Sequence, residues 1–414
     1  MRKKINVDQL AVGMYLQELV GTWLENPFWR SSFVITKAAD VALIRASRIS
    51  EVWIDTAKGL DVASAAAGVA EEVPPASPDD APGPELAQLP RPDSATQSVP
   101  IADELERAAR ICAQARQAVS DMFREARMGK AVDAQRVGEL VQDISDSVAR
   151  NRSALISLAR LKTADDYSYM HSVAVCAMMI ALARQLGFGE DDVRAAGVAG
   201  LLHDMGKALL PLAVLNKPGK LTADEFAIVR SHPELGHRIL VSSGTTSAVA
   251  LDVCLHHHEK MDGTGYPEGL KGAQISLHAR MGAICDVYDA ITSNRPYKAG
   301  WDPAESMRKM GEWAGGHFDA MVFQAFVKSL GIYPVGSLVR LSSGRLGVVT
   351  AQTTGSLTTP MVKAFYAIAQ KERIPAQDVD LSQPGCTEKI SAREDPAKWQ
   401  FEDLDAMWSR SPAA

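Results

Sequence analysis

The sequence of 414 residues is poor in features that would assign it to a class at once. It has only five cysteines and no CxxC pair, so neither a disulfide framework nor a Cys-rich zinc cage is expected. No uninterrupted apolar run approaches the ~18 residues that span a bilayer, and no apolar core follows the basic start of the chain as it would in a signal peptide. We therefore expect a reduced, cytoplasmic protein without a membrane span.

An excess of positive charge is also missing. The formal net charge is -6, which gives no general basic footprint for nucleic acid. A nucleic-acid polymer is therefore not an expected partner, and any recognition of phosphate has to be local.

Composition and hydrophobic pattern divide the chain into five expected segments. The segments are 1–62, 63–100, 101–150, 151–332 and 333–414. The first shows strand-like alternation in "GMYLQEL" and "SEVWIDT" around the helix-like "KAADVALIRAS", and predicts a small α+β domain. The second holds eight of the 21 prolines among Ala, Ser and Asp, and predicts a disordered linker.

The other three segments are predicted to be mainly helical, with strands returning at the end. Residues 101–160 carry apolar side chains at spacings of three and four, and fit either a helical connector or a dimerising signalling helix. Residues 151–332 predict an all-α domain, in which Thr222 and Glu225 form a capping box. The stretch "YPVGSLVRLSSGRLGVVTAQ" predicts a hairpin in a small β-containing extension over 333–414. The fold class is therefore mainly α.

Histidine is absent from the first 170 residues and from the last 97, so all nine histidines lie between His171 and His317. The candidates for one site follow one another at about one per helix or helix pair. They are His171, His203-Asp204, His232, His257-His258 and Asp286. In helical bundles, inward-pointing side chains of facing helices build metal sites, so this spacing suits convergence on one bundle interior.

These residue types favour a metal centre with nitrogen and oxygen ligands. A lone histidine on a helix is more often a satisfied core residue, but the ordered set with an HD pair is difficult to explain in that way. His and Asp without thiolates favour Fe, Mn or a similar divalent ion over structural zinc. Asp204 is able to bridge two cations while His203 holds one, and two close cations activate a hydroxide and clamp a phosphoryl oxygen. Lys207, one turn further on, is placed to meet a phosphate oxygen.

Several longer motifs resemble those of the HD-GYP phosphodiesterases, members of the HD superfamily that hydrolyse the bacterial second messenger cyclic di-GMP. The motifs are "HDMGK", "KPGKLTADE", "SHPELGHRIL", "HHEKMDGTGYPEGL" and "RMGAICDVYDAITSNRPYK", and together they cover about residues 150–332. "VDQLAVGMYLQEL" and "FWRSSFVITKAADVALI" resemble, less closely, a domain of unknown function that often precedes such modules.

The resemblance implies an all-helical HD-type phosphohydrolase bundle with two divalent ions, most often Fe or Mn. It implies metal ligation by His171, His203, Asp204, His232, His257 and Asp286, with His258 as a further ligand or as a partner of one. It also implies that Lys207 touches the scissile phosphate, and that Arg295 and Lys298 contact phosphates or guanine bases. His256 is expected to face away or to support its neighbours, and His237, His278 and His317 are read as structural or surface residues.

The resemblance has one departure and one open point. Some family members carry a glutamate four residues before the first histidine, where it helps hold a third metal; Tyr167 stands there, so a two-metal site is expected. In the GYP loop, Gly263 and Gly265 permit unusual backbone angles and Pro267 fixes the exit. Tyr266 of this loop either contacts the ligand or a partner, such as a GGDEF-type diguanylate cyclase, or the loop simply seats the two histidines.

Three functions remain open at this point. The first is a phosphodiesterase that opens cyclic di-GMP to linear pGpG, with GMP as the product of a second cut. The second is a non-catalytic cyclic di-GMP receptor that signals through the GYP loop and the helices at 101–160, for example as a homodimer. The third is an HD nucleotidase that acts on mononucleotides. The intact ligand set favours the first.

Overall fold

The computed structural model describes residues 2–20, 33–35, 41, 44–45, 51–62, 99–161, 167–217, 219–244, 247–293, 300–353 and 356–409. The chain divides into two compact units, residues 1–88 and 89–414. Almost all of the predicted linker at 63–100, and most of the helix-like run before Ile54, fall outside the described residues.

The first unit contains an antiparallel sheet with the strand order β1-β4-β2-β3. Its strands are β1 (Arg2–Asn6), β2 (Tyr15–Val20), β3 (Phe33–Val34) and β4 (Glu51–Asp55). Burial alternates along β4, where Val52 and Ile54 face the core of this unit, as the pleat of a half-buried strand requires. The strands predicted in "GMYLQEL" and "SEVWIDT" are therefore confirmed.

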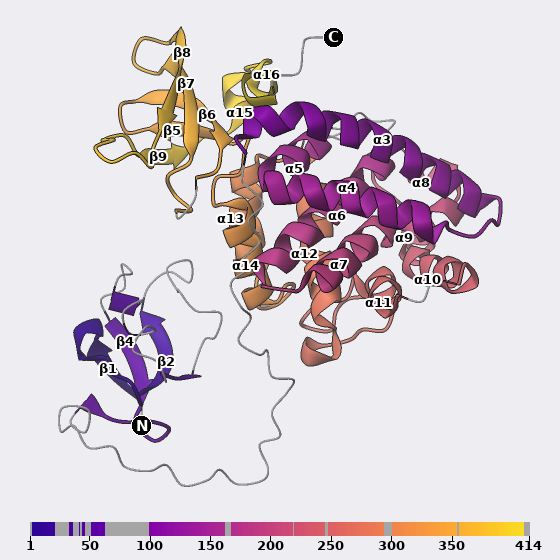
Figure 1. Ribbon diagram of the computed structural model, residues 1–414, viewed down its shortest axis with the longest axis horizontal. Helices are drawn as coiled ribbons and strands as arrows, with labels where there is room; N and C mark the ends of the chain where they lie inside the picture. The colour runs from indigo at the N-terminus through magenta and orange to yellow at the C-terminus, as the bar shows by residue number, and fades with distance from the viewer. Residues whose placement is uncertain are drawn as a thin grey trace. The chain divides into compact units, whose positions relative to one another are not determined.

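The second unit is largely helical (Figure 1). Its helical elements are α3 (Ile101–Arg127), α4 (Ala134–Arg150), α5 (Arg152–Arg160), α6 (Tyr167–Gln185), α7 (Glu190–Leu202), η3 (Met205–Leu209), α8 (Leu212–Leu215), α9 (Ala223–Arg230), α10 (His232–Ser242), α11 (Ala248–His256), η4 (Gly272–Gln274), α12 (Leu277–Thr292), α13 (Pro303–Trp313) and α14 (Ala320–Leu330). The capping box of Thr222 and Glu225 begins α9 as predicted.

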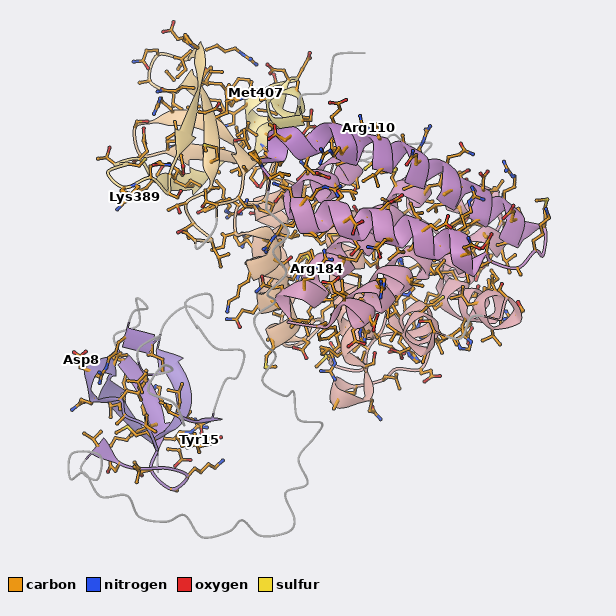
Figure 2. All side chains as sticks on the ribbon, viewed as in Figure 1. Asp8, Tyr15, Arg110, Arg184, Lys389 and Met407 are labelled. Atoms are coloured by element: carbon orange, nitrogen blue, oxygen red, sulfur yellow. The ribbon has the colours of Figure 1, made fainter. Side chains whose placement is uncertain are left out.

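Helix α6 forms the centre of the bundle. Every residue from 170 to 183 is buried, and α6 packs against α3, α4, α5, α7, α12 and α14. A helix that is apolar on all sides has to be covered on all sides, which explains this position. Arg184 near its end donates to the Ser145 carbonyl of α4 at 2.9 Å (Figure 2).

Two glycines permit the close contact that brings η3 against α10. A Cβ atom on Gly206 would lie 1.8 Å from the carbonyl oxygen of His232, and one on Gly236 would lie 2.6 Å from Cys254 Sγ. Real side chains are excluded at such distances. The glycines therefore place the HD pair, which directly precedes η3, beside the first residue of α10.

Helices α3 and α4 run along one side of the bundle and are joined by a buried ion pair (Figure 1). Glu104 is fully buried, and its carboxylate accepts hydrogen bonds from Arg150 at 2.8 and 2.9 Å and from Ser147 at 2.8 Å. A buried carboxylate is tolerated when its oxygens are satisfied in this way.

A five-stranded antiparallel sheet follows the helices, with the order β8-β7-β6-β5-β9. Its elements and the two helices after it are β5 (Leu338–Leu341), β6 (Arg345–Ala351), β7 (Met361–Ala367), β8 (Glu372–Asp380), β9 (Ile390–Arg393), α15 (Pro396–Trp399) and α16 (Leu404–Ser409). The predicted hairpin is the antiparallel pair β5 and β6. Asp302 ties the sheet to the helices, because it accepts from Leu338 N at 3.3 Å while it caps α13.

The predicted mainly α class is confirmed, with small sheets near the two ends of the chain. Among the described residues, no helix combines the length and the apolar character that crossing a bilayer requires. The predicted boundaries at 150/151 and 332/333 stay predictions.

Candidate metal centre

Asp204 lies at the middle of the predicted site, directly after α7 and before η3. The carboxylate is buried, and its two oxygens face different sets of imidazoles. Oδ2 lies 3.4 Å from Nε2 of both His171 and His203, whereas Oδ1 lies 3.2 Å from Nε2 of His232 and 3.8 Å from Nε2 of His257. The Asp204 carboxylate therefore lies between two groups of candidate ligands.

The first ligand group consists of His171 from α6, His203 at the end of α7 and Asp286 from α12. His171 Nε2 lies 3.0 Å from Asp286 Oδ1, and His203 Nε2 lies 3.9 Å from the same oxygen. Two ligand atoms bound at right angles to an ion at about 2.1 Å are about 3 Å apart. The first group therefore has the spacing of a metal site.

The second ligand group consists of His232, His257 and His258, from the start of α10 and the end of α11. His232 Nε2 and His257 Nε2 are 3.2 Å apart, and the ring centroids of His232 and His258 are 5.0 Å apart. His258 also faces the first group, because its Nδ1 lies 3.7 Å from Asp286 Oδ2.

Hydrogen bonds from Nδ1 to backbone carbonyls fix the orientation of three of these imidazoles. The Nδ1 atom of His203 is 2.8 Å from the Gly200 carbonyl, and that of His232 is 2.7 Å from the Val229 carbonyl. His257 Nδ1 meets the carbonyl oxygens at the end of α11, at 3.0 and 3.1 Å. A carbonyl accepts only from a protonated nitrogen, so Nε2 of each ring keeps its lone pair for an ion.

His171 is oriented by a carboxylate instead of a carbonyl. Its Nδ1 lies 2.6 Å from Oδ2 of Asp289, which is one turn beyond Asp286 on α12 and 2% exposed. The other oxygen of Asp289 accepts from Ser293 Oγ at 3.2 Å. Asp289 thus supports a ligand without being in either group, and the sequence analysis did not single it out. Its position one turn after Asp286 in "DVYD" was the available signal.

The electrostatics of the centre favour anionic carboxylates and neutral imidazoles. Burial opposes the ionisation of Asp204, but Lys207 and the neighbouring imidazoles hold the pKa of its carboxyl well below the usual value. Burial lowers the pKa of His203 and His257, and lowers that of His258 to about 3. These are the protonation states that metal ligation requires.

His171 shows that the site attracts positive charge. Burial lowers its pKa, but hydrogen bonds with Asp204, Asp286 and Asp289 outweigh burial and raise the pKa to about 10. In addition, His203 Nε2 and Asp204 Oδ1 are buried without a hydrogen-bond partner in the chain. Unpaired buried polar atoms are costly, and a bound cation would satisfy both. The donor set therefore fits divalent metal ions.

The predicted substrate contacts lie beside this centre where the structure describes them. The Lys207 ammonium forms a close ion pair with Asp204 Oδ2. The Tyr266 ring packs on that of His258, with centroids 4.7 Å apart and planes 30° apart. Arg295 and Lys298 lie outside the described residues, as does the side chain of Tyr167.

The buried carboxylate of Glu259 holds the GYP loop in place. Glu259 Oε1 accepts from the backbone amides of Glu268 and Gly269 at 2.8 and 3.0 Å. A Cβ atom on Gly265 would lie 2.4 Å from Glu259 Cα, so only glycine permits this close packing of the loop on itself. These contacts fix the conformation of the loop that follows the two histidines, and Glu259 is not among the residues predicted from the sequence.

The remaining histidines of the described chain lie outside the two ligand groups. His256 turns to Asp252, whose Oδ1 lies 2.8 Å from its Nδ1. His317 stacks on Phe318, and His278 packs edge-on against Phe188.

Two family models match the chain, one in its N-terminal part and one over the helices that carry the candidate site. Residues 143–322 match the family model described as HD domain, and residues 2–137 match a domain of unknown function, DUF3391. Three relatives are similar to the chain to different extents. The chain is 53% identical over 410 residues to a Pseudomonas aeruginosa protein named cyclic di-GMP phosphodiesterase PA4108, with 99% of the chain and 96% of the relative covered.

Two further relatives match shorter parts. The chain is 36% identical over 193 residues to the cyclic di-GMP phosphodiesterase response regulator RpfG of Xanthomonas campestris, covering 46% of the chain and 50% of the relative. It is 35% identical over 164 residues to 3'3'-cGAMP-specific phosphodiesterase 1 of Vibrio cholerae, covering 40% of the chain and 38% of the relative.

Proposed function

The chain belongs to the HD-domain family that includes the Pseudomonas aeruginosa phosphodiesterase PA4108, and we propose that it is a metal-dependent phosphodiesterase that hydrolyses cyclic di-GMP. The observation that carries the proposal is the Asp204 carboxylate, whose two oxygens face two separate imidazole groups. The substrate is taken from the named relatives, and two of the three described above carry this activity in their names.

The two ligand groups would each hold one divalent ion, with Asp204 shared between them. His171, His203 and Asp286 would bind one ion, and His232, His257 and His258 the other. The nitrogen and oxygen donors favour Fe or Mn. When bound, the ions would supply Lewis-acid charge and a deprotonated water as nucleophile.

The chain's own groups orient this chemistry. The Nδ1 hydrogen bonds and Asp289 hold the imidazoles so that Nε2 points to the centre. Lys207 would place positive charge beside a phosphoryl oxygen as negative charge builds up there. A P–O bond forms to water, the bond to the ribose 3'-oxygen breaks, and that oxygen takes a proton. The product is linear pGpG, and a second cut of the same kind would give GMP.

Four further parts of the proposal concern binding and partners. Arg295 and Lys298 would contact phosphates or guanine edges, for which a guanidinium fork is well suited. Tyr266, which packs on His258, would contact the substrate at the rim. The GYP loop would also meet GGDEF-type cyclases, and the helices at 101–160 would support a homodimer.

The test is hydrolysis of cyclic di-GMP by protein purified without oxygen and loaded with Mn²⁺ or Fe²⁺, with products separated by chromatography. Asp204→Asn should abolish turnover, while Asp191→Asn should not, because Asp191 is an exposed residue of α7 that forms its ion pair with Arg194. If the protein binds metal and cyclic di-GMP but forms no product, it is a receptor and the proposed enzymatic function is wrong. If 3'3'-cGAMP or mononucleotides are tested in the same way and are hydrolysed in preference to cyclic di-GMP, the proposed substrate is wrong.

A further inference from the structure

Arg230 is the last residue of α9, two positions before the predicted ligand His232. Its guanidinium carbon lies 4.6 Å from the centroid of the Tyr266 ring. The same ring lies 4.7 Å from the ring of His258. Tyr266 thus contacts both a predicted metal ligand and an arginine that no motif had marked.

Backbone contacts hold this arginine at the edge of the centre. The Val229 carbonyl, one residue before it, accepts the hydrogen bond of His232 Nδ1 at 2.7 Å. The position of Arg230 therefore depends on two predicted ligands. It is tied to His232 through the backbone and to His258 through the Tyr266 ring.

The guanidinium has hydrogen-bonding capacity left. Arg230 is exposed, and throughout the described ranges no carboxylate forms an ion pair with it. Packing on an aromatic ring uses the face of the guanidinium and leaves the N–H edge for a ligand. That edge matches the two oxygens of a phosphodiester.

Lys207 and Arg230 differ in their distance from the centre. Lys207 pairs directly with the central carboxylate of Asp204, so we expect it to contact the phosphate that is cleaved. Within the described part of the chain, Arg230 pairs with neither Asp204 nor Asp286 and instead lies over the Tyr266 ring, which packs on His258. A cyclic dinucleotide carries a second phosphodiester on the opposite side of its ring, and this group needs a cation at the rim of the site.

We propose that Arg230 binds the phosphodiester of the substrate that is not being cleaved. The inference rests on the proposed function, because it takes a cyclic dinucleotide as the substrate. It makes Arg230 a determinant of specificity for substrates with two phosphates, in addition to Arg295 and Lys298.

The test compares two substrates in the full-length, Mn²⁺-loaded protein. Cyclic di-GMP has two phosphodiesters, whereas bis(p-nitrophenyl) phosphate has one and carries no base. Arg230→Gln should raise KM for cyclic di-GMP by about 10- to 100-fold, the effect of one charge-assisted contact, while kcat changes by less than about threefold. With the small diester, kcat/KM should fall by less than about threefold, so the two losses differ clearly.

Two variants serve as controls. Arg230→Lys keeps the charge without the fork and should recover part of the loss in KM. Arg110→Gln removes an exposed arginine on α3 (Figure 2) and should change neither substrate's kinetics. Bound Mn²⁺ is measured in every variant, because a lost ion would lower both activities together.

The results separate this inference from the proposed function. If the wild type does not hydrolyse cyclic di-GMP, the proposed function and this inference both fall. If the wild type does so but Arg230→Gln leaves its KM unchanged, or lowers both activities equally, Arg230 only supports the Tyr266 ring and the inference alone is wrong.

Discussion

Replacing Asp289 with Asn should weaken one of the two expected metal ions and spare the other. The 2.6 Å contact with His171 Nδ1 joins two residues that are each 2% exposed. A charge-assisted hydrogen bond in such a place contributes about 1.5–3 kcal/mol. Loss of an outer partner of a metal ligand typically lowers metal affinity by about 10- to 100-fold, which is the same range.

The ligand groups allow this effect to be assigned to one ion. Asp289 orients His171, which belongs only to the first group, whereas His232 and His257 are oriented by backbone carbonyls. Equilibrium dialysis against graded Mn²⁺, with bound metal measured by mass spectrometry, should therefore show two tight ions in the wild type. In Asp289→Asn the dissociation constant of one Mn²⁺ ion should rise by about 10- to 100-fold, and that of the other ion should stay unchanged.

A matched control is available in the same chain. Asp252 makes the same type of contact with His256, at 2.8 Å, but His256 is in neither ligand group. Asp252→Asn should leave both dissociation constants unchanged. The reasoning would be refuted if the two variants behaved alike, or if Asp289→Asn lost both ions together while its far-UV circular dichroism and urea midpoint matched the wild type.

Three further predictions concern stability. Burial raises the pKa of Asp302 from 3.8 to about 6, so its contribution to stability is complete below pH 3.8 and declines as the pH rises through 6. In urea titrations at different pH, the free energy of unfolding should fall with a slope of up to about 1.4 kcal/mol per pH unit, and Asp302→Asn should lack this slope. Parallel pH profiles of the two proteins would contradict this prediction. Arg150→Ala removes the closer cation of the fully buried Glu104, leaves it only Arg107 at 3.9 Å, and should cost about 3 kcal/mol in the free energy of unfolding; much of this loss should be regained when Glu104→Leu is added. Gly206→Ala puts a methyl group 1.8 Å from the His232 carbonyl and should lower thermal stability and bound Mn²⁺ together; a variant with normal metal content would show that η3 can move away.

The sequence predicted the parts of this protein that follow local rules. The capping box of Thr222 and Glu225 and the hairpin of β5 and β6 are determined by neighbouring residues, and both are present. The histidines of the site could be predicted from the sequence, because a metal site is one of the few reasons for placing histidines on successive helices. The structure brings all of the predicted ligands together, although their role in metal binding stays a prediction.

The supporting residues could not be found in this way, because their meaning depends on partners far away in the chain. Asp289 is 118 positions from His171, and Arg230 meets Tyr266 only after α9 and the GYP loop have folded against the same centre. Gly206 looks like any glycine of a turn until the His232 carbonyl is placed against it. Tertiary packing, which no local pattern encodes, gives these residues their roles.

The charges of the proposed site also explain why its ligands are mainly neutral. Two divalent ions would bring four positive charges, and the carboxylates of Asp204 and Asp286 remove two of them. The five imidazoles add none, because a histidine nitrogen that binds an ion carries no proton. The ions and their direct protein ligands would thus keep a net positive charge, which attracts the negatively charged phosphodiesters of a cyclic dinucleotide. A third carboxylate ligand would cancel part of that attraction, and this gives a physical reason for Asp289 to act through His171 from outside the ligand groups.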